Sequence, residues 1–449
     1  MQQNIHSRRR HKQRGQTILL VAISLVSLLA MAALAIDVVT LYVASSQIQR
    51  AADAAALAGA KAIADSGFTS LPSTDPHYAA AQTLAQTMAT KAVNSMITAS
   101  SINLVDGQLP ALPAPPSMDF TTHPGSYQIT VSLRASNLPT FFSKIWGASA
   151  ASVTATATAE AYNPANLTNI TPISPKSVKP WLVANRNPHD GAQFVNTLSG
   201  TWAVDSSVIG ESIDLVSDCN SGRIGRCGPL TSNPPQAVSG TTTQVQYVPA
   251  TVTTPNTQNV CPSCVGGTDY EQSIECADVA TSYQVLSCGG GTVQVQWDDN
   301  INPGAAGNNA TSLGGQCLIH ASSEGAGQGQ DVLDPSPWPN NPMKITAQSG
   351  PQNGNLVTTS NSIVTIPILD TPAGSRLTRG SLVTVDGFLQ GFINEVDDGT
   401  GGGATPPPAG SINITVLNIV GCSNTNNGAT AVVGGSGTSP IPVRLITPP

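Results

Sequence analysis

Charged and aromatic side chains are scarce in this sequence of 449 residues. Charged residues make up 10% of the chain and aromatic residues 4%, whereas roughly 25% of an ordinary soluble domain is charged. There are 19 basic residues against 26 acidic ones, and the first 14 residues hold several bases and no acid. The rest of the chain is therefore acidic. It lacks the basic face that binds phosphates, which excludes nucleic acid as an expected partner.

Sequence motifs for catalysis are also missing. The chain holds no G-x-S-x-G, no H-E-x-x-H and no P-loop. His189-Asp190 lies in a turn-like stretch, and Asp298-Asp299 and Asp397-Asp398 lack the ligand spacing of an EF-hand. We therefore expect no catalytic residue, no cofactor, no metal ion and no small-molecule substrate.

One long apolar run is present, near the N-terminus. From Thr17 to Ile36, 20 residues include only three polar ones. As a helix this run would be about 30 Å long, the thickness of a bilayer core. The basic residues directly before it are Arg8, Arg9, Arg10, Lys12 and Arg14. The positive-inside rule then predicts that residues 1–16 form a cytoplasmic tail and that the bulk of the chain lies across the membrane.

The ends of this run set the predicted membrane boundary. Arg14 and Gly15 mark its cytoplasmic side, and Asp37 marks its far side. The alternative is a cleaved signal peptide, which has a shorter apolar region ending in a small-x-small site. Ala33-Leu34-Ala35 fits such a site. The length of the run favours a retained anchor, and no other segment reaches 18 apolar residues, so we expect a single span.

Two helices are predicted next. Ser45 to Ala64 is dominated by alanine, the best helix former, and should continue the first helix until Gly67. Asp75-Pro76 should begin a second helix, with an apolar residue every three or four positions. We expect the alanines between Gln47 and Ala62 to pack against another element. The side expected to pack carries Ala51, Ala54, Ala55, Ala58 and Ala62.

Two strands follow the helices. Ser126–Arg134 and Ser152–Tyr162 alternate polar and apolar side chains, as half-buried strands do. Between them, residues 138–147 carry four bulky side chains, which would either cap the core or touch the outer membrane leaflet; we favour the core. Residues 37–162 are thus predicted to form a small α+β module with two strands.

A specific motif crosses the first helix. Arg14-Gly15-Gln16 leads into it, Asp37 ends the apolar run, and Ile48-Gln49-Arg50-Ala51-Ala52-Asp53-Ala54-Ala55-Ala56-Leu57-Ala58-Gly59-Ala60 follows. Over about residues 8–162 the chain resembles the TadE/TadG-like proteins of Flp pilus assembly, the tight-adherence system. The resemblance implies a bacterial envelope protein whose partners are pilus or secretion-assembly proteins. Pilin-like relatives carry a Glu five residues after the processing Gly; Leu20 stands there, which argues against prepilin-peptidase cleavage.

The remaining two-thirds of the chain is predicted to be all-β. Residues 163–180 hold four prolines and are typical of a linker. Residues 181–449 should form a β-rich exported domain, a sandwich or similar, with Gly/Asn/Ser-rich loops. The predicted strands are residues 242–248, 292–297, 362–369, 381–385 and 411–419.

Every cysteine lies in this predicted domain: Cys219, Cys227, Cys261, Cys264, Cys276, Cys288, Cys317 and Cys422. Export favours disulfides, and the sequence leaves their pairing open. Cys261-Pro262-Ser263-Cys264 has two other interpretations. A redox pair would need a βαβ context, and a zinc site would need a second close pair; neither is present. Disulfides are the prediction for all eight.

Three functional hypotheses remain. The leading one is a single-pass protein of the bacterial inner membrane, with its C-terminal bulk periplasmic or extracellular and a structural or assembly role in the Flp pilus. The second is a cell-surface adhesin that uses the C-terminal β-domain. The third, a periplasmic hydrolase, is the weakest because no nucleophile and base stand out.

Overall fold

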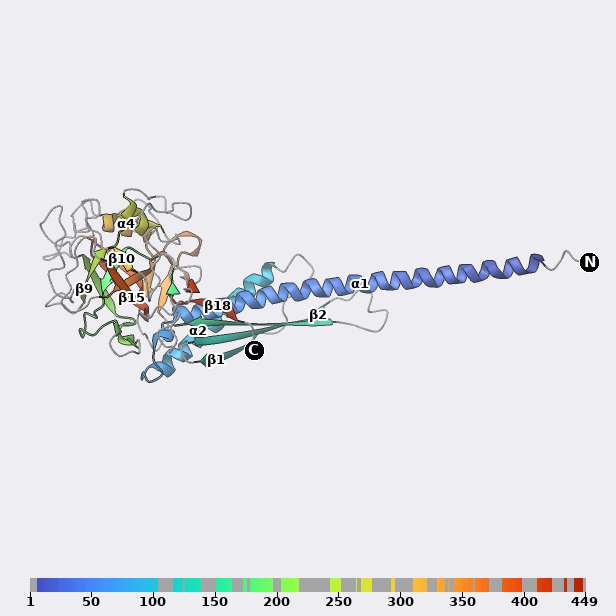
Figure 1. Cartoon of the computed structure of the whole chain (residues 1–449), viewed down its shortest axis with the longest axis horizontal. Helices are drawn as coiled ribbons and strands as arrows, with labels where there is room; N and C mark the ends of the chain where they lie inside the picture. The colour runs from blue at the N-terminus through green and yellow to red at the C-terminus, as the bar shows by residue number, and fades with distance from the viewer. Residues whose placement is uncertain are drawn as a thin grey trace, which may run out of the picture.

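The computed structural model of the chain shows a long helix with a β-rich domain at the end away from the N-terminus (Figure 1). A smaller sheet and a second helix lie along the half of the long helix nearest that domain (Figure 1). The structure describes residues 6–103, 116–123, 126–138, 151–163, 173–175, 178–196, 203–217, 243–251, 264, 268–276, 292–294, 310–320, 329–335, 338, 343–357, 360–370, 382–397, 410–421, 432–433 and 440–446.

The first helix, α1, is continuous over His6–Asp65 and 60 residues long. It joins the predicted span and the predicted Ala-rich helix without a break, as the alanine content led us to expect. The chain leaves it at Gly67, which has a φ of 74°. This left-handed conformation costs glycine little and explains why the helix stops there.

The second helix, α2 (Tyr78–Asn103), begins slightly later than Asp75-Pro76 predicted. The side chain of Asp75 accepts a hydrogen bond from the backbone of His77 instead, within the turn before the helix. The apolar stripe of α2 packs on the core, with Ala81 and Ala85 buried and Met88 partly buried. The predicted packing of this helix on α1 is confirmed.

The smaller sheet has four strands, in the order β1-β2-β3-β18. Strands β2 (Ser126–Leu138) and β3 (Ala151–Tyr162) are the two predicted ones. The prediction of a two-stranded module was wrong, because β1 (Ser117–His123) and β18 (Val443–Ile446) flank them. Strand β1 directly follows a Pro-rich segment that obscured it, and β18 comes from the far end of the chain. The predicted cap at residues 139–147 lies outside the described residues.

The larger sheet has seven strands, in the order β10-β15-β14-β5-β9-β8-β16, and β15 also pairs with β16. This extra pairing closes six strands into a ring, a more closed arrangement than the predicted sandwich. Two neighbouring pairs, β14–β5 and β8–β9, are parallel. The strands are β5 (Trp181–Ala184), β8 (Ser212–Ser217), β9 (Gln244–Pro249), β10 (Thr292–Gln294), β14 (Ile363–Leu369), β15 (Leu382–Val396) and β16 (Ile412–Gly421).

Short elements complete the β-rich domain. Its smaller sheets pair β4 (Ile173–Ser174) with β17 (Val432–Val433), β6 (Val195–Asn196) with β7 (Ala203–Val204), and β11 (Val332–Asp334) with β12 (Lys344–Thr346) and β13 (Leu356–Val357). One-turn helices are η1 (Phe68–Ser70), η4 (Ser206–Val208) and η7 (Gly350–Gln352).

Two helices add to the predicted strand-rich fold: α3 (Asp269–Glu275) and α4 (Ala310–Leu318). The sequence indicated a loop over much of α4 because of its glycines. A Cβ on Gly314 would lie 3.0 Å from the carbonyl oxygen of Glu271. The glycine therefore allows α4 to lie close against α3, a tertiary reason that propensity does not capture.

Candidate functional site: the anchor helix and its joint with the β-domain

The N-terminal half of α1 is covered by no other part of the described protein. Its large apolar side chains between Ile18 and Ile36 are 52–71% exposed. Among the described helices, this one is long and apolar enough to cross a membrane. A contiguous apolar surface of this size needs a covering environment. Residues 17–36 are therefore a candidate transmembrane helix, where the sequence placed it.

The three predicted boundary residues all lie on α1. Asp37, on the far side of the predicted span, is only 5% exposed, although its neighbours Ile36 and Val38 are more than half exposed. It is the single charged residue between Thr17 and Gln49. Arg14 and Gly15 lie about one turn before the described apolar surface. Their boundary role stays a prediction.

The second half of α1 buries a stripe of small residues against β3 and α2. The buried positions recur every three or four residues, at Ala44, Ile48, Ala51, Ala52, Ala55, Ala56, Ala60 and Ile63. Ala54 and Ala58, which we expected on this side, are only partly buried. The packed side is turned toward Ala52 and Ala56 because α2 and the sheet contact adjoining sides of the helix.

Gly59 is the point of closest approach on this stripe. A Cβ there would lie 2.6 Å from Cδ1 of Ile129 in β2 and 2.9 Å from Cγ2 of Val93 in α2. Such distances are shorter than real contacts, so a side chain at position 59 would force its neighbours to move. The alanine- and glycine-rich sequence thus lets one helix touch a second helix and a sheet at once.

The comparisons with known proteins concern this same stretch. Residues 15–62 match the Tad family model, described as "Putative Flp pilus-assembly TadE/G-like". Residues 15–62 are TadE/G-like. The match covers about a tenth of the chain and takes in the candidate transmembrane part of α1 and most of its buried alanine stripe. Searches of curated proteins and of solved structures each gave no match.

The TadE/G-like helix ends inside the β-domain. The side-chain amide of Asn418, in β16, donates a 2.8 Å hydrogen bond to the carbonyl oxygen of Ala64. Ser70, just after the helix, donates through Oγ to the carbonyl of Ile419 at 2.8 Å. All four residues are buried. A Cβ on Gly67 would lie 2.8 Å from the Leu417 carbonyl oxygen, so the turn after α1 lies directly on β16.

Three aromatic rings pack together at the same joint, from the turn after α1, from α2 and from the small sheet. Phe68 is fully buried, with ring centroids of Tyr127 and Tyr78 at 4.1 Å and 5.0 Å. The hydroxyls of Tyr78 and Tyr127 share a hydrogen bond. Burial raises the pKa of Tyr127 above its ordinary value, so its hydroxyl stays neutral. The turn after α1, α2 and β2 therefore meet in one apolar cluster.

The C-terminal strand also ties the two parts together. Strand β18 pairs with β3, and Nε of Arg444 donates a 2.5 Å hydrogen bond to Oε1 of Glu160. The Glu160 side chain is 6% exposed, and its other oxygen accepts a hydrogen bond from Ser126 at 3.0 Å. The guanidinium lies 5.8 Å from the ring centre of Tyr162. Because the chain returns from the β-domain to the small sheet of the N-terminal module, the two parts are joined twice.

Both described ends of the predicted linker are packed, and the end at Asn163 lies at this joint. Asn163 is buried and donates to Oγ of Ser70 at 3.3 Å. Lys179 is 2% exposed, and its ammonium donates to the carbonyls of Ile274 and Cys276 at the end of α3, at 2.7 Å and 3.0 Å. These residues pack into the fold rather than forming a free tether.

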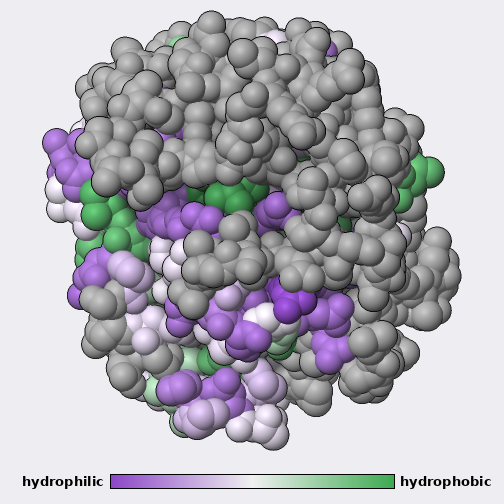
Figure 2. All heavy atoms as spheres, turned by 90° about the vertical axis from the view of Figure 1, so that its left-hand side faces the viewer, coloured by the Kyte–Doolittle hydropathy of each residue, from purple (hydrophilic) through white to green (hydrophobic). Residues whose placement is uncertain are grey.

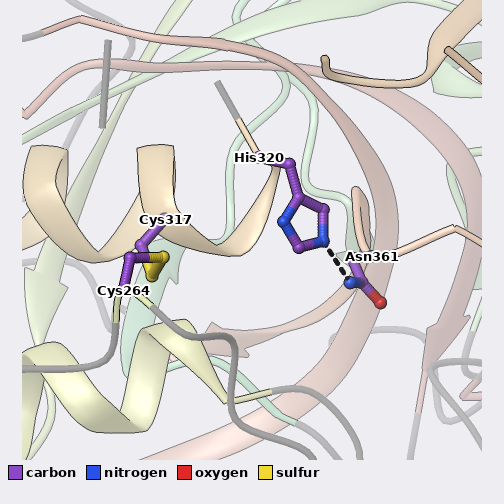
Figure 3. Close-up of a disulfide and its surroundings, with 4 residues drawn as sticks. All are labelled: Cys264, Cys317, His320 and Asn361. Carbon is purple, nitrogen blue, oxygen red and sulfur yellow. Dashed lines mark hydrogen bonds between the residues drawn. A yellow bond between two sulfur atoms is a disulfide. The ribbon is translucent and has the colours of Figure 1, made fainter. Parts of the chain in front are cut away.

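Three of the eight cysteines lie in the described part of the chain. Cys264 forms a disulfide with Cys317 in α4, with their Cα atoms 5.8 Å apart (Figure 3). Beyond α4, Nδ2 of Asn361 donates to Nε2 of His320 at 2.8 Å (Figure 3). Cys276 is disulfide-bonded as well. Cys264 therefore pairs across to a helix and not with Cys261. The others, Cys219, Cys227, Cys261, Cys288 and Cys422, lie outside the described residues.

Chemistry-bearing side chains are dispersed in the β-domain. The described residues contain no group of three or more His, Cys, Asp or Glu side chains that could hold a metal ion. Asp386 in β15 is fully buried, and the side-chain amide of Asn185 donates to its Oδ2 at 3.3 Å. Burial, together with the nearby charge of Asp370, raises the pKa of Asp386 to about 7. His189, expected in a solvated loop, lies 3.4 Å from Glu211 and both are partly exposed.

The described outer surface of the β-domain is mainly polar. On the β-domain face that points away from α1, hydrophilic residues surround small apolar areas (Figure 2). Along α2 a shallow groove runs beside Phe120, lined by threonines such as Thr83, Thr87 and Thr90. These hydroxyls donate to carbonyls one turn back in the same helix, so they are already satisfied.

Proposed function

We propose that the protein is a membrane-anchored envelope protein of the Flp pilus type, with a structural or assembly role and no catalytic activity. The observation that carries this proposal is the overlap of two features on one helix. The TadE/G-like match begins at residue 15, and the exposed apolar surface of α1 begins at Ile18. The same match then extends over the alanine stripe that docks α2 and β3.

The proposed topology places residues 1–16 in the cytoplasm and the module and β-domain beyond the inner membrane. Two observations support it. The basic residues precede the span, as the positive-inside rule requires. The β-domain carries disulfides at Cys264–Cys317 and at Cys276, and disulfides persist in oxidising compartments such as the periplasm.

The proposed role follows from how α1 ends. A flexible tether would let the β-domain move freely, whereas here the helix is hydrogen-bonded to β16 and β18 returns to the module. A rigid connection suits a part that holds or guides assembly components at a set distance from the membrane. The proposed partners are pilus or secretion-assembly proteins.

The test is a strain that lacks this chain. We expect few or no pili on its surface, and recovery of pili when the full chain is restored. A matched version without residues 1–36, exported by a cleavable signal peptide, should fail to restore them. Normal pili with lost surface attachment would contradict the assembly role and favour the adhesin alternative. A periplasm-dependent reporter fused after Pro449 should be active; an inactive reporter would contradict the topology.

A further inference from the structure

The apolar exposed surface of α1 does not end at Ile36. Val38, Val39, Tyr42 and Val43 are 57%, 60%, 76% and 45% exposed. They form one side of the helix, because residues three and four apart are neighbours on a helix surface. The opposite side of this stretch is packed: Asp37 and Ala44 are buried and Leu41 is partly buried. The helix thus has a protein-facing and a bare apolar side for two turns beyond the predicted boundary.

Charge follows the same division. Between Thr17 and Gln49 the one charged residue is Asp37, and it is the residue that the protein covers. The bare side therefore presents no charge from Ile18 to Val43. Polar character begins at Ser45, and Arg50 is the first exposed charge. In water the opposite arrangement is favourable, with the charged side chain exposed and the valines buried.

The length of this surface matches a whole bilayer. From Thr17 to Val43 the helix is about 40 Å long, which equals a hydrocarbon core of about 30 Å plus part of a headgroup layer. Tyr42, the most exposed large apolar side chain of the helix, lies near its end. Tyrosine is enriched at that depth because its ring is apolar and its hydroxyl is polar.

The sheet reaches the same level. Nε2 of Gln49 donates a 3.2 Å hydrogen bond to the carbonyl of Thr156, which fixes β3 beside α1. From Thr156 back to Ala151, the start of β3, is about 16 Å. The same distance along α1 is about 11 residues, which leads to Val38. By these lengths, the described end of the sheet reaches the level of Asp37 along α1.

We propose that the far membrane boundary lies at Val43 rather than at Asp37, and that Val38, Val39, Tyr42 and Val43 contact lipid in the outer interface. The module's sheet end, level with Val38, then enters the outer interface and shields Asp37 from lipid. This inference rests on the proposed anchor and is carried by continuity: the bare side prolongs the transmembrane surface without a gap. A protein partner on this side is the competing occupant.

The depth of a fluorophore in the membrane can distinguish lipid from a protein partner on this side of the helix. The full chain would carry one added cysteine, Val39→Cys or Tyr42→Cys, labelled with an environment-sensitive dye and reconstituted in phosphatidylethanolamine–phosphatidylglycerol vesicles. The unmodified chain gives the background from native cysteines. Arg50→Cys is the water-exposed control, and Leu28→Cys, in the middle of the span, is the control for the anchor itself.

We expect dyes at positions 39 and 42 to be quenched severalfold more by a spin label near the lipid headgroups than by aqueous iodide. The dye at position 50 should show the reverse. Iodide quenching at 39 and 42 equal to that at 50 would overturn the proposal. Protection from both quenchers would show a protein occupant and also overturn it. Iodide quenching at Leu28→Cys would instead mean that the anchor has failed.

Discussion

The amide of Asn418 lies 2.8 Å from the Ala64 carbonyl oxygen and 2.6 Å from Oε1 of Gln390, and donates to both. One side chain of β16 thus binds the last turn of a membrane helix and a neighbouring strand of the closed sheet. Asn418 and Gln390 are nearly fully buried. Water cannot replace these bonds, so the joint depends on them.

Asn418→Ala should therefore destabilise the fold by about 1–3 kcal/mol, because two buried acceptors lose their donor. Chemical unfolding of the detergent-solubilised chain would measure the loss. Asn94→Ala is the matched control, since Asn94 is exposed on α2 and alanine favours a helix. Equal stability of the two variants would show that the joint does not rest on Asn418.

Gly59→Ala should destabilise the module by about 1–3 kcal/mol through overpacking. The nearest atom to the new methyl group would be Cδ1 of Ile129. Ile129→Val removes that atom, so the double variant should lose less stability than the sum of the two single changes. Strict additivity in a double-mutant cycle of thermal stability would argue against contact at this position.

Ala55→Leu and Ala58→Leu make a matched pair on one helix. Ala55 is fully buried and Ala58 partly exposed. The first change should cost about 1–3 kcal/mol and the second much less, because leucine is also a good helix former. Melting temperature and abundance in cells are the measurements. If both variants match the parent, the alanine stripe is a spacer and not a packing surface.

Arg444→Gln should weaken the docking of β18, at a cost on the order of 1–2 kcal/mol, because the Glu160 carboxylate keeps its burial and loses a charged donor. Faster proteolytic removal of the C-terminal residues would report the change. Arg134→Gln, at an exposed position on β2, is the control. The same proteolysis rate for both variants would contradict a role for the ion pair.

Asp386 should make stability depend on pH. Its folded pKa is about 7, above the ordinary value of 3.8. Between these values the folded state keeps a proton that the unfolded state has released, so stability should fall as pH rises from about 4 to about 7. Asp386→Asn should reduce this fall, with a difference on the order of 1–3 kcal/mol. Unfolding at pH 5 and pH 8 would test it, with Asp119→Asn, exposed on β1, as control. An unchanged pH profile would refute the assignment.

The sequence predicted most of what depends on local pattern. The span, the helix end at Gly67 and the alternating strand from Ser126 are readable because burial repeats with the period of the element. The predicted packing side of the alanine-rich helix was wrong at Ala54 and Ala58. A run of alanines carries the same side chain on every side of the helix, so the sequence does not show which side is buried. Only the neighbours, α2 and β3, decide which alanines are buried.

Features that join distant segments were not predictable. Val443–Ile446 is too short to stand out as a strand, and its partner lies nearly 300 positions earlier. Asn418 looks like any polar residue of a strand until the end of α1 is placed beside it. The pairing of Cys264 with Cys317 likewise follows from the packing of α4 and not from spacing in the sequence.

Because the β-domain is attached to the N-terminal part of the protein at two places, a tilt of α1 would move the β-domain with it. About 30 Å of α1 lies between Val43, the proposed membrane boundary, and the joint at Ala64, and both the joint and β18 prevent the helix from rotating within the protein. A tilt of about 10° at the proposed boundary would therefore shift the β-domain sideways by about 5 Å. A neighbouring protein that tilts the helix within the proposed membrane span would therefore also displace the β-domain at the other end of the molecule.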